Sequence, residues 1–316
     1  MERQDAPYLV FLGEACIDEY YETDRWGEMG DKMMLRPVEN LVGGMVANAA
    51  GVAAGLGQKC YLVDSLSDSP VCRQLRAAME AEGIDTSYTL HDPGMADPKC
   101  IIVTQGGERV VCVVDTARAP RRITPRHQRL LDGAAWIYTI VRTLQQVEGA
   151  EAVLDRARAA GAKLYLDVEG VVAEDNDPRF LRRADGLTFN EQGFAAFRGD
   201  RSEGACLKDL FAGGVEFVAV TLGPGGCRVH TPGRTIACSG LPVAPVDTTG
   251  AGDTWGAAFL WARVNGWALD DCARFANGMA ARACTVLGAR GGICSLEEAR
   301  RWMDRAPQAV ETRAAP

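Results

Sequence analysis

Short, uninterrupted apolar segments recur along this chain and alternate with stretches of helical character. The apolar segments are typical of buried strands, and they lie at residues 8–13, 59–65, 134–141, 163–168, 186–190 and 215–223. Among the stretches between them, 69–83 places Ser69 as an N-cap and Pro70 at the first helical position. Strands that are apolar on both faces and joined by helices predict an α/β fold: a three-layer α/β/α sandwich around a mostly parallel sheet. Ligands of such sheets bind at the carboxyl ends of the strands.

Two segments do not follow this alternation. Residues 19–42 are polar and aromatic without a helical period, and residues 98–115 resemble a hairpin with its turn near Gly106 and Gly107. We expect the two segments to form a small flap beside the main sheet. We also expect a single domain over residues 1–316, and fraying over the last dozen residues.

Charge and cysteine usage exclude several classes of protein. The net charge is −8 and no long basic run is present, which argues against a nucleic-acid partner. No apolar run reaches the ~18 residues of a membrane span, and the first residues lack the basic region of a signal peptide. The 11 cysteines are scattered without a CxxC pair, and the three histidines show no metal-ligand spacing. This pattern argues against a disulfide framework or a zinc site and favours a cytoplasmic protein.

The stretch "PVDTTGAGDTWGAAFLWARVNG", at residues 245–266, places small residues and one carboxylate directly before a helix-forming run. The unpaired N–H groups and the dipole at such a helix start bind an anion such as a phosphate. Asp253 would lie in the first turn, beside that anion, and could accept a proton from an attacking hydroxyl. Positioning and charge stabilisation of this kind suit phosphoryl transfer. The alternative is an ordinary helix start with Asp253 as a first-turn acid.

Within this stretch, "DTTGAGDTWGAAF" closely resembles the C-terminal signature of the ribokinase-like (PfkB) family of carbohydrate kinases. The resemblance extends over most of the chain. It includes "FLGEACIDEY" at 11–20, "VGGMVANAAGVAAGLG" at 42–57, "DGLTFNEQGFAAF" at 185–197, "VAVTLGPGGC" at 218–227 and "FANGMAARACTVLGARGG" at 275–292. It implies a ribokinase-like fold with a β-lid from about residues 16–40 and 96–117. It also implies ATP and Mg²⁺ as cofactors and, in many members, K⁺.

The resemblance assigns roles to individual residues. Asp253 would be the catalytic base, and the backbone N–H groups of Gly250, Ala251 and Gly252 would form the anion hole. The sugar would be held by Asp18, Gly43, Gly44 and Asn48. The nucleotide would be held by Asn190, Thr221, Gly223, Gly226 and Asn277, with Asn277 facing the adenine. Asp247 and Thr249 match positions that bind a monovalent cation. Several of these residues also have plain structural interpretations, such as a cap for Asn48 or a turn for Gly43-Gly44.

Three positions depart from the family pattern. Gly193 stands where the family usually has a glutamate that organises Mg²⁺, and this puts metal affinity or rate in question. Met45-Val46 replaces the Lys-Gly of many ribose-specific members. Arg142 lies where some members add a substrate side chain, and an arginine there would suit an acidic or phosphorylated sugar, although a surface role is the alternative.

These observations predict an ATP-dependent phosphotransferase that phosphorylates a hydroxymethyl group of a small sugar or sugar acid. A nucleoside kinase of the same fold is one alternative, because Tyr20, Tyr21, Trp26, Met33 and Met34 could stack a base. The other alternative is a catalytically weak, sugar-binding regulatory homologue, which the Gly193 departure motivates. The expected partners are the sugar and ATP, with neither nucleic acid nor membrane, and a homodimer through the lid is a further expectation.

Overall fold

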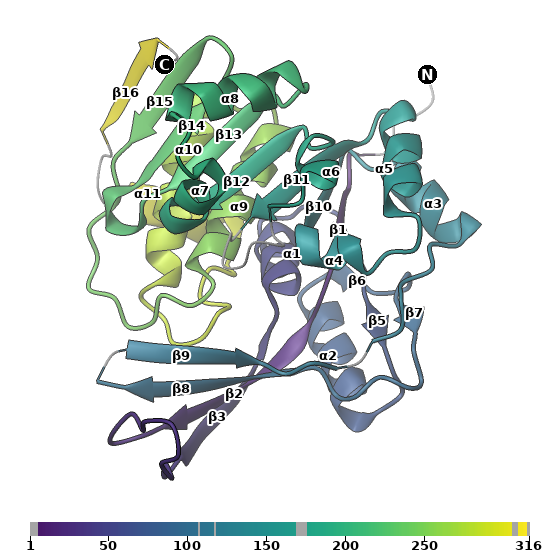
Figure 1. Ribbon diagram of the computed structural model, residues 1–316, viewed down its shortest axis with the longest axis vertical. Coiled ribbons are helices and arrows are strands. Elements are labelled where there is room, and N and C mark those ends of the chain that lie inside the picture. Colours follow the sequence, from purple (N-terminus) through teal and green to yellow (C-terminus); the bar gives the residue numbers. More distant parts are fainter. Residues whose placement is uncertain (1–5, 107, 117, 169–175, 305–308, 315–316) are drawn as a thin grey trace.

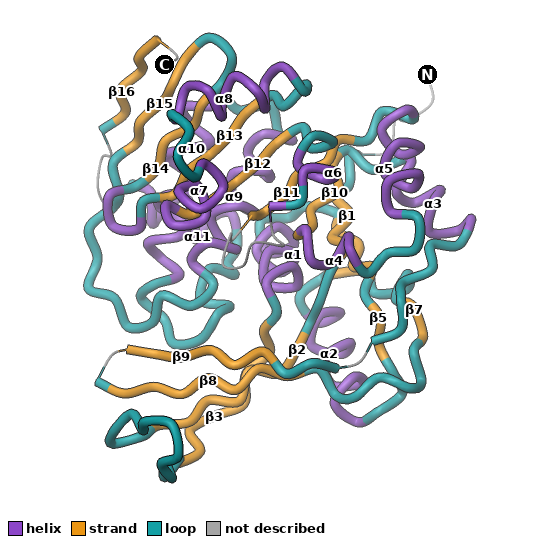
Figure 2. The backbone as a smooth tube through the Cα atoms, in the orientation of Figure 1, coloured by secondary structure: helices purple, strands orange, loops and turns teal. Residues whose placement is uncertain are grey.

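The computed structural model describes residues 6–106, 108–116, 118–168, 176–304 and 309–314, and its centre is a large twisted sheet (Figures 1 and 2). Among these residues the sheet has ten strands. In sheet order they are β16 (Val310–Ala314), β15 (Arg234–Cys238), β14 (Cys227–His230), β13 (Phe217–Thr221), β12 (Gly186–Asn190), β11 (Lys163–Val168), β10 (Trp136–Ile140), β1 (Leu9–Leu12), β4 (Cys60–Val63) and β6 (Ile84–Asp85). The strands from β13 to β6 are parallel, whereas β14, β15 and β16 are joined antiparallel.

Helices cover both faces of this sheet. One apolar core packs the sheet against α1 (Met45–Gly55), α2 (Pro70–Ala81), α9 (Ala251–Val264), α10 (Leu269–Ala283) and α11 (Leu296–Met303). The opposite core packs it against α3 (Pro125–Asp132), α4 (Val141–Gln145), α5 (Ala150–Ala159), α6 (Pro178–Leu181), α7 (Glu191–Arg198) and α8 (Glu203–Ala212). Alternate residues of β1 divide between the two cores, so its apolar run is buried on both sides. The predicted three-layer α/β/α sandwich is confirmed.

A second sheet projects from the main body (Figure 1). This small sheet has the order β3 (Arg36–Gly43), β2 (Cys16–Glu22), β8 (Lys99–Gln105), β9 (Glu108–Val113). The pair β2–β8 is parallel, and the β2–β3 and β8–β9 pairs are antiparallel. Its strands come from the two segments that lacked helical periodicity. The hairpin predicted at 98–115 is present as β8 and β9, and Gly107 of its predicted turn lies outside the described residues.

Two local predictions have opposite outcomes. The start of α2 is as expected: Pro70 is its first residue, and the Ser69 hydroxyl accepts a hydrogen bond from the Cys72 N–H at 3.0 Å. The predicted fraying of the last dozen residues is wrong for 310–314, because β16 pairs with β15 along five residues. The edge strand β15 offered unpaired backbone groups, and the tail satisfies them. A short parallel pair, β5 (Ser65–Leu66) with β7 (Leu90–His91), lies apart from both sheets.

The topology brings polar residues to one edge of the main sheet. Asp167 and Asn190 lie at the carboxyl ends of β11 and β12, and Thr221 ends β13. Glu14 and Arg142 follow β1 and β10. The carboxyl edge of the parallel strands therefore carries several polar and charged residues, as expected for this class of sheet.

Candidate active site

Helix α9 begins without a side-chain cap. Its N-cap residue, Gly250, has φ +74°, and a Cβ there would clash with the carbonyl oxygen of Ala289. Of the predicted anion-hole residues, Ala251 already donates its N–H to the carbonyl of Thr248 at 3.3 Å. Gly252 lines a cavity, and a Cβ there would meet no atom within 4 Å. The backbone at Gly252 is therefore open to a ligand at the positive end of the α9 dipole.

Asp253 is 7 % exposed and is held by a chain of side chains from distant segments. Its Oδ2 accepts a hydrogen bond from Asn48 Nδ2 on α1 at 2.8 Å. The Asn48 Oδ1 in turn accepts a hydrogen bond from Arg290 at 3.2 Å, and Arg290 Nε donates to Glu82 Oε1 at 3.1 Å. Asn48 and Asp253, which were predicted for the acceptor sugar and for catalysis, are therefore in direct contact. Arg290 and Glu82 fix the amide orientation of Asn48, and sequence reasoning missed both.

Asp18 and the glycine pair also come together. In β3, Gly43 is opposite Cys16 of β2, and a Cβ on Gly43 would clash with the Asp18 carboxylate. Gly44 has φ +99°, and a side chain there would clash with the Glu14 carbonyl. Burial raises the pKa of Asp18, against the lowering effect of hydrogen bonds from the Cys16 and Cys100 thiols. Gly43 thus gives the Asp18 carboxylate space, and Gly44 lets the chain pass close to the Glu14 backbone at the junction of β3 and α1.

A cavity of about 250 Å³ lies between the small sheet and the carboxyl edge of the main sheet. Its walls come from the turn into α1, from β2, β8 and the end of β9, and from the ends of β10 and β11. Its charged lining residues are Glu14, Lys99, Arg118, Arg142 and Asp167. None of the described residues that line it is aromatic.

The charges around this smaller cavity differ in how they are compensated. Lys99 pairs with Glu19 at 3.2 Å, and Arg118 pairs with the buried Asp64 at 2.7 Å. Arg142, by contrast, is exposed and makes no ion pair or hydrogen bond with any residue that the structure describes. Among the described residues, Arg142 is therefore the one cation of this cavity lining without a partner.

Asp167 is a functional candidate that sequence reasoning missed. Burial raises the pKa of its carboxyl from 3.8 to about 6, although a hydrogen bond from the Tyr138 hydroxyl lowers it in part. That hydrogen bond measures 2.7 Å, and both groups are buried. A polar residue near the carboxyl end of a predicted parallel strand was the available signal.

A larger cavity of about 480 Å³ lies beside the start of α9. Thr221, Gly223 and Gly226, all predicted to contact the nucleotide, line it together with Ala251 and Gly252. Gly223 and Gly226 flank the tight turn between β13 and β14, with φ of +53° and +95°. The loop that follows β15 supplies an apolar wall of Leu241, Pro242, Val243 and Pro245.

The other two predicted nucleotide residues are engaged within the protein. Asn277 borders the larger cavity but is buried: its amide donates to the carbonyls of Cys238 and Ser239 at 3.1 and 3.0 Å and accepts from Trp255 Nε1 at 2.8 Å. These contacts hold the Asn277 side chain in place in the wall of the cavity. Asn190 caps α7, where its Oδ1 accepts a hydrogen bond from the Gly193 N–H at 2.6 Å. Its strand position is opposite Thr221.

Asp247 and Thr249, predicted to hold a monovalent cation, form a compact turn that contacts the small sheet. Asp247 accepts hydrogen bonds from the Thr249 N–H and hydroxyl at 2.9 and 2.6 Å and from the Gly288 N–H at 3.0 Å. From the small sheet, the Tyr20 hydroxyl reaches Asp247 at 3.3 Å and Arg109 approaches it at 3.7 Å. Burial alone would raise the pKa of Asp247, but these hydrogen bonds and Arg109 hold it below its usual value.

The chain is similar to several solved structures and curated proteins that are named as kinases. The ribokinase of Arabidopsis thaliana, solved with ribose and ATP, superposes with a TM-score of 0.82 at 25 % identity, over 95 % of this chain and all of that one. An ATP-dependent ribose-1-phosphate kinase of Halopiger xanaduensis is 28 % identical over 288 residues, which is 89 % of this chain and 93 % of the relative. The ribokinase of Bacillus subtilis is 25 % identical over 92 % of this chain and 97 % of its own.

The fold is thus that of the ribokinases, a class of α/β phosphotransferases. The model of the pfkB family carbohydrate kinases matches residues 6–295, so the chain belongs to that family. It is a carbohydrate kinase, an enzyme that transfers a phosphoryl group to an alcohol. Among the described residues, no helix has the length and apolar character needed to span a bilayer.

Proposed function

We propose that the enzyme transfers the γ-phosphoryl group of ATP to a hydroxymethyl group of a small sugar or sugar acid, with Asp253 as the base. The observation that carries this proposal is the position of Asp253 between two binding regions. It follows Gly252, which lines the larger cavity, and its carboxylate binds Asn48 of α1, the helix whose first residues line the smaller cavity. A carboxylate at this point can take the proton of an acceptor hydroxyl while the α9 N-terminus stabilises the transferred group.

The larger cavity suits the nucleotide. Its apolar wall at 241–245 fits a purine base, and the glycine turn at 223–226 lets the backbone approach a phosphate chain. The open backbone at Gly252 then faces the terminal phosphate. Thr221 would add a hydroxyl at the end of β13, while Asn277 shapes the wall from behind.

The smaller cavity suits a sugar better than a nucleoside. Its described lining has polar and charged groups but no aromatic ring to stack a base. Of the aromatic residues that could have served a nucleoside, Tyr20 instead donates to Asp247. Asp18, with Gly43 and Gly44 beside it, would bind sugar hydroxyls.

A specific observation favours an anionic acceptor within this class. Arg142 is the cation of the smaller cavity that no described residue neutralises, and a carboxylate or phosphate on the sugar would neutralise it. The relative from Halopiger xanaduensis carries the name of a kinase for a phosphorylated sugar. We therefore place sugar acids and sugar phosphates first among the acceptors.

The residues of the site fit the two expected cations differently. No described residue that lines the larger cavity carries a carboxylate, so Mg²⁺ would be held mainly by the ATP phosphates and water. Its chemistry there would be to neutralise phosphate charge. For K⁺, both oxygens of Asp247 already accept hydrogen bonds, and the neighbouring positive charge is Arg109. In this arrangement the residues do not fit K⁺.

The small sheet would act as the lid of a single kinase domain. Its strands form one wall of the smaller cavity, and its contacts from Tyr20 and Arg109 reach the turn before α9. Closure would exclude water, which otherwise competes as phosphoryl acceptor. We also propose that the exposed edge of this sheet pairs with a second copy of the chain.

The test is ADP release with Mg-ATP across neutral sugars, sugar acids, sugar phosphates and nucleosides, for the wild type and Arg142→Gln. We expect turnover with an anionic sugar, and a KM for that sugar that rises at least tenfold in Arg142→Gln. Turnover confined to nucleosides would contradict the acceptor class. ATP binding without turnover on any acceptor would favour the regulatory homologue.

A further inference from the structure

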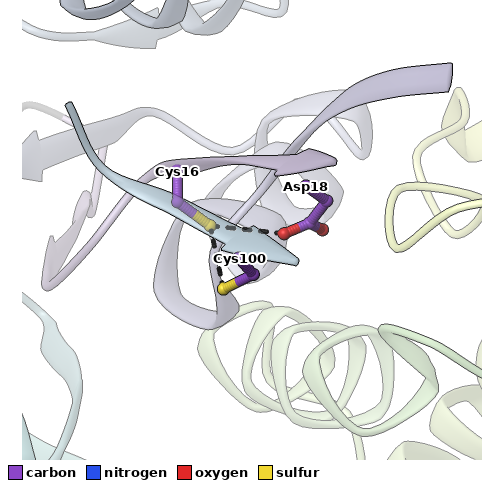
Figure 3. Close-up of side chains that lie close together, drawn as sticks. All are labelled: Cys16, Asp18 and Cys100. Atoms are coloured by element: carbon purple, nitrogen blue, oxygen red, sulfur yellow. Dashed lines mark hydrogen bonds between the residues drawn. The ribbon is translucent and has the colours of Figure 1, made fainter. Parts of the chain in front are cut away.

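Three potential metal ligands meet at the base of the small sheet (Figure 3). Cys16 and Asp18 are two residues apart in β2, so their side chains lie on the same face of the sheet. Cys100 of β8 is opposite Asp18 in the parallel pair, so its side chain shares that face. The thiol of Cys16 lies 3.4 Å from Asp18 Oδ1 and 3.8 Å from the Cys100 sulfur. One ligand atom from each residue lies within 4.8 Å of the others. Chain spacing gave no sign of this cluster, because Cys100 comes from another strand.

The distances match those required by a tetrahedral zinc ion. With Zn–S bonds of about 2.3 Å and Zn–O bonds of about 2.0 Å, two sulfurs on one ion lie about 3.8 Å apart and a sulfur and an oxygen about 3.5 Å apart. The observed separations are 3.8 Å and 3.4 Å. A set of two thiolates and one carboxylate suits Zn²⁺, Co²⁺ or Cd²⁺ and excludes Mg²⁺ or Ca²⁺, which require oxygen ligands.

The same two cysteines are poorly placed for a disulfide. Cys16 is two positions out of register with Cys100 across the β2–β8 pair. With strands ~4.8 Å apart and a rise of ~3.3 Å per residue, their α-carbons lie about 8 Å apart. A disulfide requires about 4.4–6.8 Å. A bridging ion accommodates this separation without backbone movement, whereas an S–S bond does not.

Cys16 and Cys100 both line the smaller cavity, so an ion held by the three side chains would face it. Zinc is bound in this way, by three protein ligands with a fourth position left open, in sites that are not purely structural. We propose that Cys16, Asp18 and Cys100 form a binding site for a thiophilic divalent cation, Zn²⁺ in particular, in the wall of the smaller cavity.

An ion at this site is also expected to inhibit turnover, and this expectation rests on the proposed function. An ion bound at Asp18 Oδ1 would neutralise the carboxylate that, under the proposed function, accepts hydrogen bonds from the sugar hydroxyls, and it would occupy space in the wall of the same cavity. Zinc therefore inhibits the kinase in competition with the sugar. The site itself requires no assumption about the reaction.

The test is a titration of the full-length, reduced, metal-free protein with Co²⁺ alone. We expect one equivalent per chain, with a thiolate-to-cobalt charge-transfer band and the intense visible bands of a tetrahedral ion, all abolished by one equivalent of Zn²⁺. Cys112→Ser is the matched control, because Cys112 is an exposed thiol on β9 of the same sheet. It keeps the complete spectrum.

The ligand variants give distinct signatures. Cys16→Ser and Cys100→Ser weaken Co²⁺ binding at least tenfold, a loss of about 1.4 kcal/mol, and remove thiolate intensity. Asp18→Asn weakens binding but keeps the thiolate band, a pattern that general destabilisation does not produce. A wild type without the band, or a band that survives either cysteine substitution, overturns the site. A metal-bound enzyme with undiminished turnover overturns only the inhibition.

Discussion

Gly250 and Gly252 stand two residues apart at the start of α9, and the structure gives them different reasons to be glycine. Gly250 is required by the backbone, since it has φ +74° and no room for a Cβ beside Ala289. Gly252 has helical geometry and open space, so only a ligand would require its missing side chain. The two positions therefore separate a folding requirement from a catalytic one.

We predict that Gly250→Ala destabilises the protein by roughly 1–3 kcal/mol, the cost of a strained backbone position. Gly252→Ala should leave stability unchanged or raise it by about 0.5–1 kcal/mol, as for Gly to Ala within a helix. Its methyl group would displace the phosphate, and kcat/KM should fall about 10²-fold. Thermal melts and kinetics check both. A stable, fully active Gly252→Ala would contradict phosphate binding at this backbone.

Asp167 makes the stability of the protein depend on pH in a defined direction. Its pKa rises from 3.8 to about 6 on folding, because burial disfavours the charged carboxylate. Below about pH 4 the carboxyl is protonated in both states. Between about 4 and 6 only the unfolded chain loses the proton, so the contribution of Asp167 to stability falls as the pH rises.

We therefore predict that Asp167→Asn gains stability relative to the wild type between pH 4 and pH 7. The gain should approach about 3 kcal/mol, at about 1.36 kcal/mol per pKa unit. The asparagine oxygen can still accept the Tyr138 hydrogen bond. Denaturant unfolding of both proteins at the two pH values measures the difference. If the difference in unfolding free energy between the two proteins is the same at pH 4 and pH 7, Asp167 has an ordinary pKa in the folded protein.

The edge strand β9 has an exposed apolar surface that could pair with another strand. Val110, Val111 and Val113 are all exposed, at 46 %, 47 % and 57 %, and β9 pairs only with β8 among the described residues. An exposed apolar edge of this kind is a template for pairing with another strand. This is the physical basis of the proposed homodimer.

We predict a dimer for the wild type and a monomer for Val111→Lys, measured by size-exclusion chromatography with light scattering. A lysine on an edge strand opposes pairing. Ala196→Lys, at an exposed position of α7, controls for the added charge and should remain dimeric. A monomeric wild type would contradict pairing through this edge.

Sequence patterns predicted elements well where burial alone decides the structure. β1, β10 and β13 follow continuous apolar runs, and α2 follows its Ser69 cap and Pro70. The tail strand β16 was missed because four of its five residues are exposed, so it carries no apolar signal. Its position depends on hydrogen bonds to β15, which a local pattern cannot reveal.

The residues of the candidate site also fall into those that a local sequence pattern indicates and those that it does not. Asp253, Asn48, Asp18 and the glycines were predictable because each belongs to a local signature. Arg290 and Glu82 were not, because they act through side-chain contacts between segments about 200 residues apart, as the 208-residue separation of that pair shows. Asn277 was assigned to adenine from its motif, and its three hydrogen bonds within the protein could not be read from that motif.

At the scale of the whole molecule, the small sheet is connected to the turn before α9. Arg109 donates to the Thr248 hydroxyl at 2.7 Å and lies 3.7 Å from Asp247, and Tyr20 reaches the same carboxylate. These contacts join the small sheet, which forms one wall of the smaller cavity, to the turn before α9, where the phosphate is proposed to bind. If the small sheet is the lid, as proposed, these contacts hold it against the turn before α9.

We predict that Arg109→Ala raises the KM for the acceptor roughly tenfold, the equivalent of a charged hydrogen bond of about 1.5 kcal/mol. It should also raise ATP hydrolysis without acceptor, because water enters the open site. Arg36→Ala, which removes an exposed ion pair with Asp24 on the same sheet, is the control and should change neither. If Arg109→Ala and Arg36→Ala have the same KM and the same rate of ATP hydrolysis, Arg109 does not contribute to closure of the small sheet.

The most direct test of the account compares two first-turn aspartates. Asp253→Asn removes the proposed base. Asp271→Asn removes an exposed acid from the first turn of α10, where it pairs with Arg274 at 3.3 Å and can stabilise the helix dipole. Turnover and ATP affinity are measured for both variants. We predict that kcat falls roughly 10²–10⁴-fold in Asp253→Asn with ATP binding retained, and stays unchanged in Asp271→Asn. Near-normal turnover in Asp253→Asn would contradict the assignment of Asp253 as the base.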